Sequence, residues 1–223
     1  MSQPKPIETR SYGDDASQFV DFYSAGSPRG TVVAIHGGYW RDAYGLDLLD
    51  PLATHLATTG WNVANIEYRR VHPERSGAWK KMSGDVAKAI DLTQERGGPL
   101  IAIGHSAGGQ LALWAAAQSN SHLDAVVALA PVSDLFLADG LQLSNHATRA
   151  LFDTTAAEDP NLYSSASPLH LLPLGIPQLI VHGRKDEDVP FEMAIEYAET
   201  AAMVGDDVEL LDPKDVDLSL IHI

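Results

Sequence analysis

The sequence predicts an α/β fold whose sheet is mostly parallel, with helices on both faces, in a single domain over residues 1–223. Short apolar runs alternate with helical patterns along the chain, which is typical of successive βαβ units. The length of 223 residues suits one domain with a sizeable core. The hydrophobic fraction of 45% and the charged fraction of 20% are those of an ordinary soluble globular protein.

Each expected element follows from its residue pattern, in chain order after a polar leader. Short apolar runs predict strands, which are Thr31–Ile35, Trp61–Tyr68, Leu100–Gly104, Leu123–Ala130, Pro177–His182 and Val208–Leu211. Longer stretches with helical spacing predict helices, which are Leu46–Thr58, Ser83–Arg96, Gly108–Gln118 and Phe191–Met203. Residues 134–168 fit neither period. We expect them to form a cap-like excursion over the carboxyl-end edge of the sheet, where ligands bind in open α/β folds.

Composition and charge exclude several classes of partner and location. The formal net charge of −15 repels phosphate backbones, so nucleic acid is not an expected partner. No apolar run approaches the ~18 residues of a membrane helix, and the amino terminus lacks the apolar core of a secretory signal, so we expect a cytoplasmic protein without a membrane partner. The chain has no cysteine, which removes disulfides, thiolate metal sites and a Cys nucleophile. The expected partners are a small-molecule substrate and a second copy of the chain as a homodimer.

The run GHSAG at 104–108 has the G-x-S-x-G pattern of a nucleophile turn. This pattern needs small residues two before and two after the serine, because side chains there would collide across a sharp turn between strand and helix. The context agrees, since an apolar strand ends at Gly104 and an Ala-rich helix starts after Gly108. The following helix would also point its amides at a developing oxyanion. Ser106 is therefore the predicted nucleophile.

A second motif, HGGYW at 36–40, stands at the end of an early apolar strand. Consecutive glycines let backbone amides approach a substrate closely. A His-Gly-Gly run by itself is most simply a turn. Its place after an early strand and ahead of the GHSAG unit matches the loop that completes an oxyanion hole with the amide after the nucleophile.

Together, HGGYW and GHSAGG resemble the α/β-hydrolases of the kynurenine formamidase and hormone-sensitive-lipase-like esterase groups. The runs NIEYRR (65–70), SASPLHLLP (165–173) and IVHGRKDEDVP (180–190) are similar too, and the resemblance covers residues 20 to 217. It implies the α/β-hydrolase fold and acyl or formyl hydrolysis with no metal and no organic cofactor. It further implies that Gly38, Tyr39 and Ala107 donate the oxyanion-hole amides, and that Trp40 contacts the substrate.

The acid of such a catalytic triad follows a late strand and precedes the histidine in the chain. Asp186 occupies this position in the H-G-x-x-D pattern of 182–186, where it would orient the imidazole and stabilise its charged form. Glu187 and Asp188 are rivals beside it, and Asp134 after an earlier strand is a further alternative. Each of these could equally be a solvated loop carboxylate.

The base is the member of the triad on which this sequence departs from the family pattern. Its histidine is expected after the strand Val208–Leu211, but Leu218 stands there, and the only histidine after Asp186 is His222. The run LSLIHI at 218–223 resembles a translated adapter sequence, so we expect residues 218–223 to be a non-native tail and the natural chain to continue beyond Asp217. The chain as given is then expected to be severely impaired or inactive, unless His222 folds back to serve as base.

Three interpretations of these motifs remain open. The first is a carboxylesterase or arylformamidase of the Ser-His-Asp type. The second is a serine peptidase, although nothing in the sequence indicates a gating domain. The third, from a different class, is a non-catalytic binding protein in which the pocket survives without the base. A zinc enzyme is not expected, because no H-x-x-x-H or comparable ligand cluster is present.

Overall fold

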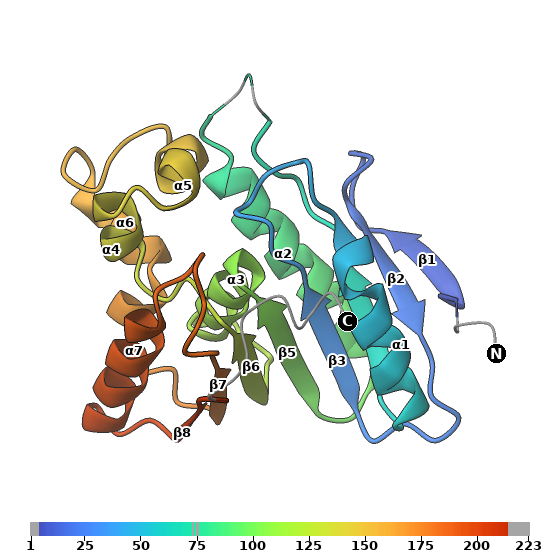
Figure 1. The fold of residues 1–223 in the computed structure, drawn as a ribbon. Coiled ribbons are helices and arrows are strands. Elements are labelled where there is room, and N and C mark those ends of the chain that lie inside the picture. Colours follow the sequence, from blue (N-terminus) through green and yellow to red (C-terminus); the bar gives the residue numbers. More distant parts are fainter. Residues whose placement is uncertain (1–4, 73, 75, 214–223) are drawn as a thin grey trace.

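A computed structural model describes residues 5–72, 74 and 76–213 of the chain. Within these residues, eight strands form one sheet in the order β1-β2-β4-β3-β5-β6-β7-β8. The first two strands pair antiparallel, β2 pairs antiparallel with β4, and all other pairs are parallel. The strands are β1 Glu8–Ser11, β2 Phe19–Tyr23, β3 Thr31–Ile35, β4 Asn62–Ile66, β5 Leu100–His105, β6 Ala125–Leu129, β7 Gln178–Val181 and β8 Val208–Leu211. The predicted α/β-hydrolase fold is confirmed (Figure 1).

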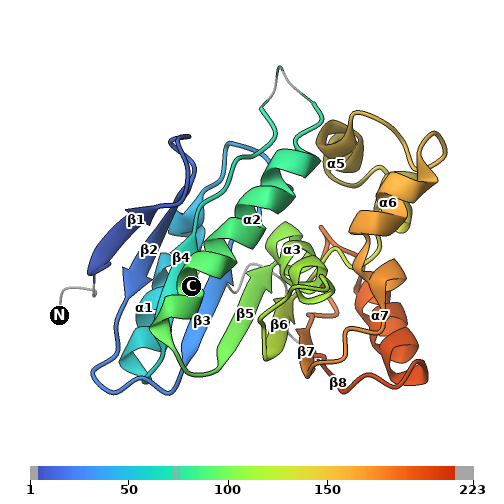
Figure 2. The same cartoon turned by 180° about the vertical axis from the view of Figure 1, so that it is seen from behind.

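The helices connect the parallel strands and cover both faces of the sheet. They are α1 Asp50–Thr58, α2 Trp79–Thr93, α3 Ala107–Ala116, α4 Leu135–Gly140, α5 Leu143–Phe152, α6 Pro160–Ala166 and α7 Phe191–Met203, with short 3₁₀ turns at Leu46–Leu49, Gln94–Arg96 and Pro168–Leu171. Seen from behind, α2 and α3 lie in front of the sheet and α1 lies on its far side (Figure 2). No described helix is long and apolar enough to cross a bilayer.

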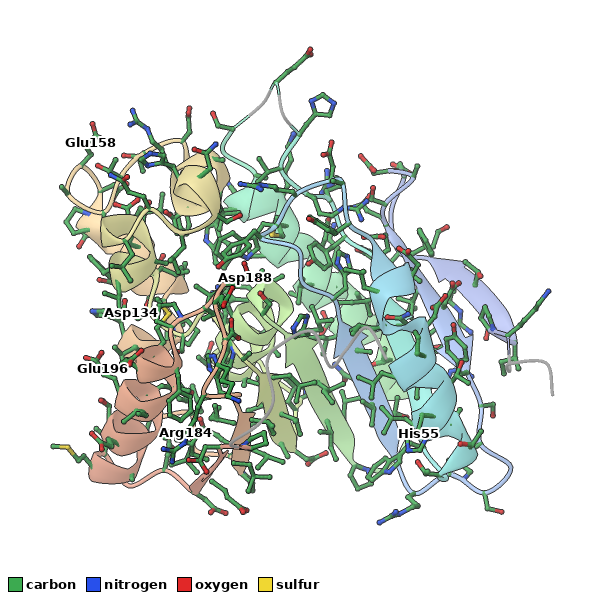
Figure 3. The ribbon with its side chains drawn as sticks, in the orientation of Figure 1. His55, Asp134, Glu158, Arg184, Asp188 and Glu196 are labelled. Atoms are coloured by element: carbon green, nitrogen blue, oxygen red, sulfur yellow. The ribbon has the colours of Figure 1, made fainter. Side chains whose placement is uncertain are left out.

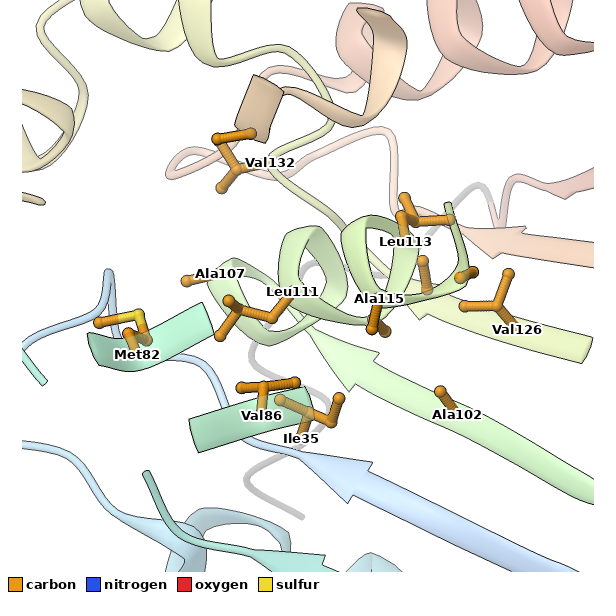
Figure 4. Packing of buried hydrophobic residues seen from close by; sticks show 14 of the residues in the cluster. Ile35, Met82, Val86, Ala102, Ala107, Leu111, Leu113, Ala115, Val126 and Val132 are labelled. Atoms are coloured by element: carbon orange, nitrogen blue, oxygen red, sulfur yellow. The ribbon is translucent and has the colours of Figure 1, made fainter. Parts of the chain in front are cut away.

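The core forms two layers because side chains alternate across a strand. On β3, Val33 and Ile35 join the larger apolar cluster, which includes α2 and α3, whereas Ala34 joins the smaller cluster beneath α1. Leu111 on α3 is fully buried among the side chains of that larger layer (Figure 4). Helix α3 is therefore buried on most sides, as its composition predicts, and the residue that precedes it is fixed by packing.

Two strands near the amino terminus lie where the sequence predicts only a polar leader. The edge strand β1 has no apolar run and alternates between partly buried and exposed residues, so its sequence carries no strand signal of its own. It is ordered by pairing with β2, with Glu8 opposite Phe22. The alternation in β2, where Val20 and Phe22 are buried, is the signal that could have indicated this hairpin.

The predicted excursion at 134–168 is helical rather than irregular. Its helices α4, α5 and α6 gather at the upper left in Figure 1, beyond the sheet. Residues Ser144, Asn145 and His146 have positive φ values of 47°, 55° and 58°. This kink divides α5 into short pieces, and short pieces leave little helical periodicity in the sequence. The second predicted helix also starts earlier than expected, at Trp79 instead of Ser83.

Candidate active site

Ser106 lies in the turn between β5 and α3 with φ 55° and ψ −118°. A non-glycine residue with this backbone conformation is strained, and the strain is held by hydrogen bonds on both sides. The Ser106 amide donates to the carbonyl oxygen of Leu129 at 2.8 Å, and the Ser106 carbonyl oxygen accepts from Gln110 at 3.1 Å. The residue is 6% exposed. The strand-to-helix turn predicted from GHSAG is present.

The glycines around Ser106 are required by close backbone contacts. A Cβ on Gly108 would lie 2.1 Å from the carbonyl oxygen of Ile35 and 2.4 Å from that of His36, well inside any real contact distance. Helix α3 therefore packs directly on the end of β3, from which the HGGYW loop emerges. Larger residues here would push the serine turn away from that loop.

The HGGYW loop lies against the serine turn, although about seventy residues separate the two motifs. A Cβ on Gly37 would lie 3.1 Å from Cβ of Ser106 and 2.6 Å from the carbonyl oxygen of His105. Gly38 and Tyr39 both have positive φ, at 101° and 47°, which gives the loop its sharp bend. The sequence motif thus brings a tightly curved backbone to the Ser106 turn.

Three amides in these two segments are available to an oxyanion. Among the described residues, no acceptor takes a hydrogen bond from the backbone N–H of Gly38, Tyr39 or Ala107. Ala107 is the first residue of α3, so its N–H has no partner within the helix. These are the amides that the sequence predicts as oxyanion donors. Their convergence on one point beside the hydroxyl stays a prediction.

Trp40, expected to contact the substrate, has its side chain fully buried. Its Nε1–H donates to Oε1 of Gln110 at 3.0 Å, and Nε2 of Gln110 donates to the carbonyl oxygen of Ala166 at 2.9 Å. Gln110 therefore joins the loop, helix α3 and the excursion through one buried amide. In this position the indole packs in the core beside Gln110 and has no exposed surface that a substrate could contact.

Asp186 follows β7 at the same carboxyl-end edge of the sheet as Ser106. Its side chain is 1% exposed. Oδ1 accepts hydrogen bonds from the amides of Asp188 and Val189 at 2.9 and 2.8 Å. Oδ2 lies 3.2 Å from Nε2 of His182, but it accepts no hydrogen bond from the described residues. That ring nitrogen lies nearer to the carbonyl oxygen of Val189, at 3.0 Å. A buried carboxylate with one oxygen unsatisfied needs another donor.

The rival carboxylates have other surroundings. Asp134 caps α4, and its carboxylate accepts the amides of Phe136 and Leu137 at 2.8 and 3.2 Å. Glu187 and Asp188 are exposed, and Figure 3 shows Asp188 on the loop above the sheet, apart from Asp134. Both carboxylates accept backbone amides, but Asp186 also keeps one buried oxygen without a donor among the described residues.

The loop that carries Asp186 is tied to the HGGYW loop by the Tyr39 side chain. The phenol donates a 2.6 Å hydrogen bond to the carbonyl oxygen of Asp188. Burial raises the pKa of this phenol, and the charges of Asp188 and Asp186 raise it further, so it remains a donor at neutral pH. All three predicted segments thus meet at one edge of the sheet. The proposed base His222 lies outside the described residues.

A cavity of about 400 Å³ opens beside Tyr39. Its wall comes from the HGGYW loop, the segment after β4 and helix α5, and several of its lining residues are small, including Ala43, Ala147 and Ala150. The volume falls in the usual range for small-molecule sites, roughly 300–1,000 Å³. No group of three or more His, Asp or Glu that could hold a metal ion occurs among the described residues.

One buried charge cluster near this site was not predicted from the sequence. Glu67 is 5% exposed and lies 3.0 Å from Nε2 of His36 and 2.8 Å from Nη1 of Arg70. The run NIEYRR contains both charged residues, but only the tertiary structure shows that they lie beneath the HGGYW loop. The sequence signal that could have indicated this cluster is the carboxylate of Glu67, which directly follows the buried strand β4.

Comparison with known proteins gives one family and several structures. The BD-FAE family model matches residues 21–200 of the chain. No curated protein matches this chain. The narrower resemblance to kynurenine formamidases stays a prediction.

Solved structures with the same fold cover nearly the whole chain. A truncated carbohydrate esterase from gut microbiota has a TM-score of 0.81 at 18% identity, over 97% of this chain and 91% of that one. A putative thioesterase from Silicibacter sp. TM1040 has a TM-score of 0.77 at 23% identity, over 97% and 80%. A thermophilic esterase from Thermogutta terrifontis has a TM-score of 0.73 at 22% identity, over 95% and 82%. At these identities the likeness shows the fold.

Proposed function

The chain belongs to the BD-FAE family, and from this premise we propose that it is a serine hydrolase that cleaves small carboxylic esters or aryl formamides. The observation that carries the proposal is the contact between Gly37 and the strained Ser106 turn. A strained serine beside a loop whose amides have no acceptor among the described residues is the arrangement that acyl transfer needs.

In the proposed reaction, Oγ of Ser106 attacks the substrate carbonyl carbon while a base takes the hydroxyl proton. The amides of Gly38, Tyr39 and Ala107 stabilise the oxyanion of the tetrahedral intermediate. Collapse expels the alcohol or amine, which receives the proton from the base, and leaves an acyl-enzyme. A water molecule then attacks the acyl-enzyme by the same steps, and the carboxylic acid product is released.

We assign the remaining roles by position. Asp186 is the acid, supported by its buried carboxylate and by the oxygen that lacks a donor among the described residues. His222 is the candidate base, because it is the only histidine after Asp186 in the chain. The ester part of the proposal is also supported by the neighbouring folds, which include a carbohydrate esterase and a thermophilic esterase.

The first experiment asks whether Ser106 is a nucleophile. The chain is treated with a fluorophosphonate probe and assayed with short p-nitrophenyl esters and N-formyl-kynurenine. We expect labelling that is abolished in Ser106→Ala and retained in Ser165→Ala, an exposed serine outside the site. Labelling of neither form, with bound ester detected but not cleaved, would favour the binding-protein interpretation.

A second experiment addresses the base. If His222 takes the serine proton, His222→Ala lowers turnover by up to about 10⁶, the loss seen when a comparable hydrolase loses its base. Turnover that is the same with and without His222 would show that this histidine is not the base.

A further inference from the structure

We propose that His36 is held as an imidazolium by Glu67, and that this buried ion pair strengthens the oxyanion donor on Gly38. The inference rests on the proposed function for its catalytic meaning. The protonation state itself follows from the hydrogen bonds and charges around the two side chains and does not depend on that function. Neither residue touches a reacting atom, so both are positioning residues.

Both ring nitrogens of His36 face acceptors. Nδ1 lies 2.9 Å from the carbonyl oxygen of Gly37, and Nε2 lies 3.0 Å from Oε1 of Glu67. A carbonyl oxygen can only accept a hydrogen bond, and so can an ionised carboxylate. If Glu67 is ionised, each ring nitrogen must carry a proton.

The surroundings of Glu67 favour its ionised form. Oε1 accepts the Tyr68 amide at 2.9 Å, Oε2 accepts the Leu46 amide at 3.1 Å, and Arg70 lies 2.8 Å away. Burial by itself raises the pKa of Glu67, but the hydrogen bond and charge of His36, with Arg70 and the Tyr68 amide, lower the pKa below its ordinary value. Arg70 and the two backbone amides favour the ionised form independently of the charge on His36. A protonated carboxyl would weaken or lose at least one of these hydrogen bonds, because its proton takes a position that a donor now occupies.

The imidazolium is also fixed in place. Its ring stacks on Tyr68 with centroids 4.4 Å apart and planes 13° apart, and the Tyr68 hydroxyl donates to the His36 carbonyl oxygen at 2.7 Å. The side chain of His36 is fully buried. Charges on His36, Glu67 and Arg70 sum to one positive charge behind the loop, in a chain with a net charge of −15.

The consequence for catalysis lies in a single peptide group. The carbonyl of Gly37 and the N–H of Gly38 belong to the same peptide unit. A charged donor on that carbonyl polarises the unit and makes the Gly38 N–H a stronger donor, as in chains of cooperative hydrogen bonds. The ion pair thus orients the loop and strengthens the hydrogen bond from the Gly38 amide to the oxyanion.

The first test does not depend on enzymatic activity. Nitrogen-detected NMR of the chain labelled with ¹⁵N-histidine should show a ring with protons on both nitrogens at neutral pH, assigned to His36 by its loss in His36→Asn. In Glu67→Gln, which keeps the side-chain shape but removes the counter-charge, one ring proton should disappear. A His36 ring with a single proton in the unsubstituted chain would overturn the proposal.

The second test compares kinetics with a matched control. With p-nitrophenyl acetate, we expect kcat to fall about 10- to 100-fold in Glu67→Gln with little change in KM, as for weakening one oxyanion donor. Asp85→Asn is the control, because Asp85 is another buried carboxylate paired with an arginine, Arg69. An equal loss of kcat in both variants would overturn the catalytic role. A chain with both ring protons but no ester hydrolysis, even as a Leu218→His version extended with a homologous carboxyl terminus, would overturn the proposed function and leave the imidazolium assignment in place.

Discussion

A Cβ atom on Gly104 would lie 2.0 Å from the carbonyl oxygen of Gly108. This contact closes the turn that holds Ser106, and it leaves no room for any side chain. We expect Gly104→Ala to destabilise the fold by about 3 kcal/mol, as severe overpacking does. The measurement is the free energy of unfolding in urea.

The matched control for this substitution is Gly84→Ala in helix α2. Nothing lies within 4 Å of a Cβ at Gly84, so alanine should stabilise that helix by up to about 1 kcal/mol. Equal stabilities for the two variants would show that the Ser106 turn relaxes easily and that the glycine pattern is not needed for folding.

The strained backbone of Ser106 predicts an opposition between stability and activity. Glycine adopts positive φ without penalty, so we expect Ser106→Gly to be more stable than Ser106→Ala by about 1 kcal/mol or more. Both variants should lack ester hydrolysis. Chemical denaturation of the pair checks this, and a less stable glycine variant would contradict the assigned strain.

Asp186 and Asp134 should respond differently to substitution. Asp186→Asn is expected to lower kcat by about 10⁴ with little effect on folding, by analogy with loss of a triad carboxylate. Asp134→Ala removes the cap of α4 and should cost about 1 kcal/mol of stability while kcat is retained. If Asp134→Ala instead abolishes turnover in a folded protein, the acid is misassigned.

Glu67 also predicts how stability depends on pH. Its pKa is lowered in the folded state, so its contribution is complete above the ordinary value of 4.5 and is lost as pH falls through the lower folded value. Glu67→Gln should therefore be less stable at neutral pH but lose less stability on acidification. Urea titrations across the acid range measure this, with Glu196→Gln on the exposed side of α7 expected to follow the unsubstituted chain.

The cavity beside Tyr39 predicts a dependence on substrate size. Ala150→Trp would fill part of its volume from helix α5, so KM should rise for esters with bulky groups and change little for p-nitrophenyl acetate. Ala202→Trp, at an exposed position of α7, is the control. If KM for bulky esters is the same in both variants, the cavity does not bind that part of the substrate.

The sequence alone determined the parts of this protein whose signals are local. Apolar runs ending in glycine motifs located β3 and β5, and the residues of α7 and β8 matched their predicted ranges. These elements were predictable because their hydrophobic patterns involve only residues close together in the chain. The Ser106 turn was also predictable, since the steric demand on Gly104 comes from Gly108, four residues later, whereas the demand on Gly108 comes from Ile35 and His36, far away in the chain.

Only the tertiary structure decided what depends on residues far apart in the chain. Strand β1 is ordered by its partner, not by its own polar residues. Trp40 is buried in the large apolar cluster, and Gln110, seventy residues later, accepts its N–H. His36 and Glu67 became an ion pair only when parallel strands β3 and β4 placed their carboxyl ends side by side. Hydrogen bonds and charges act through space at a few ångströms, and chain topology sets which groups come that close.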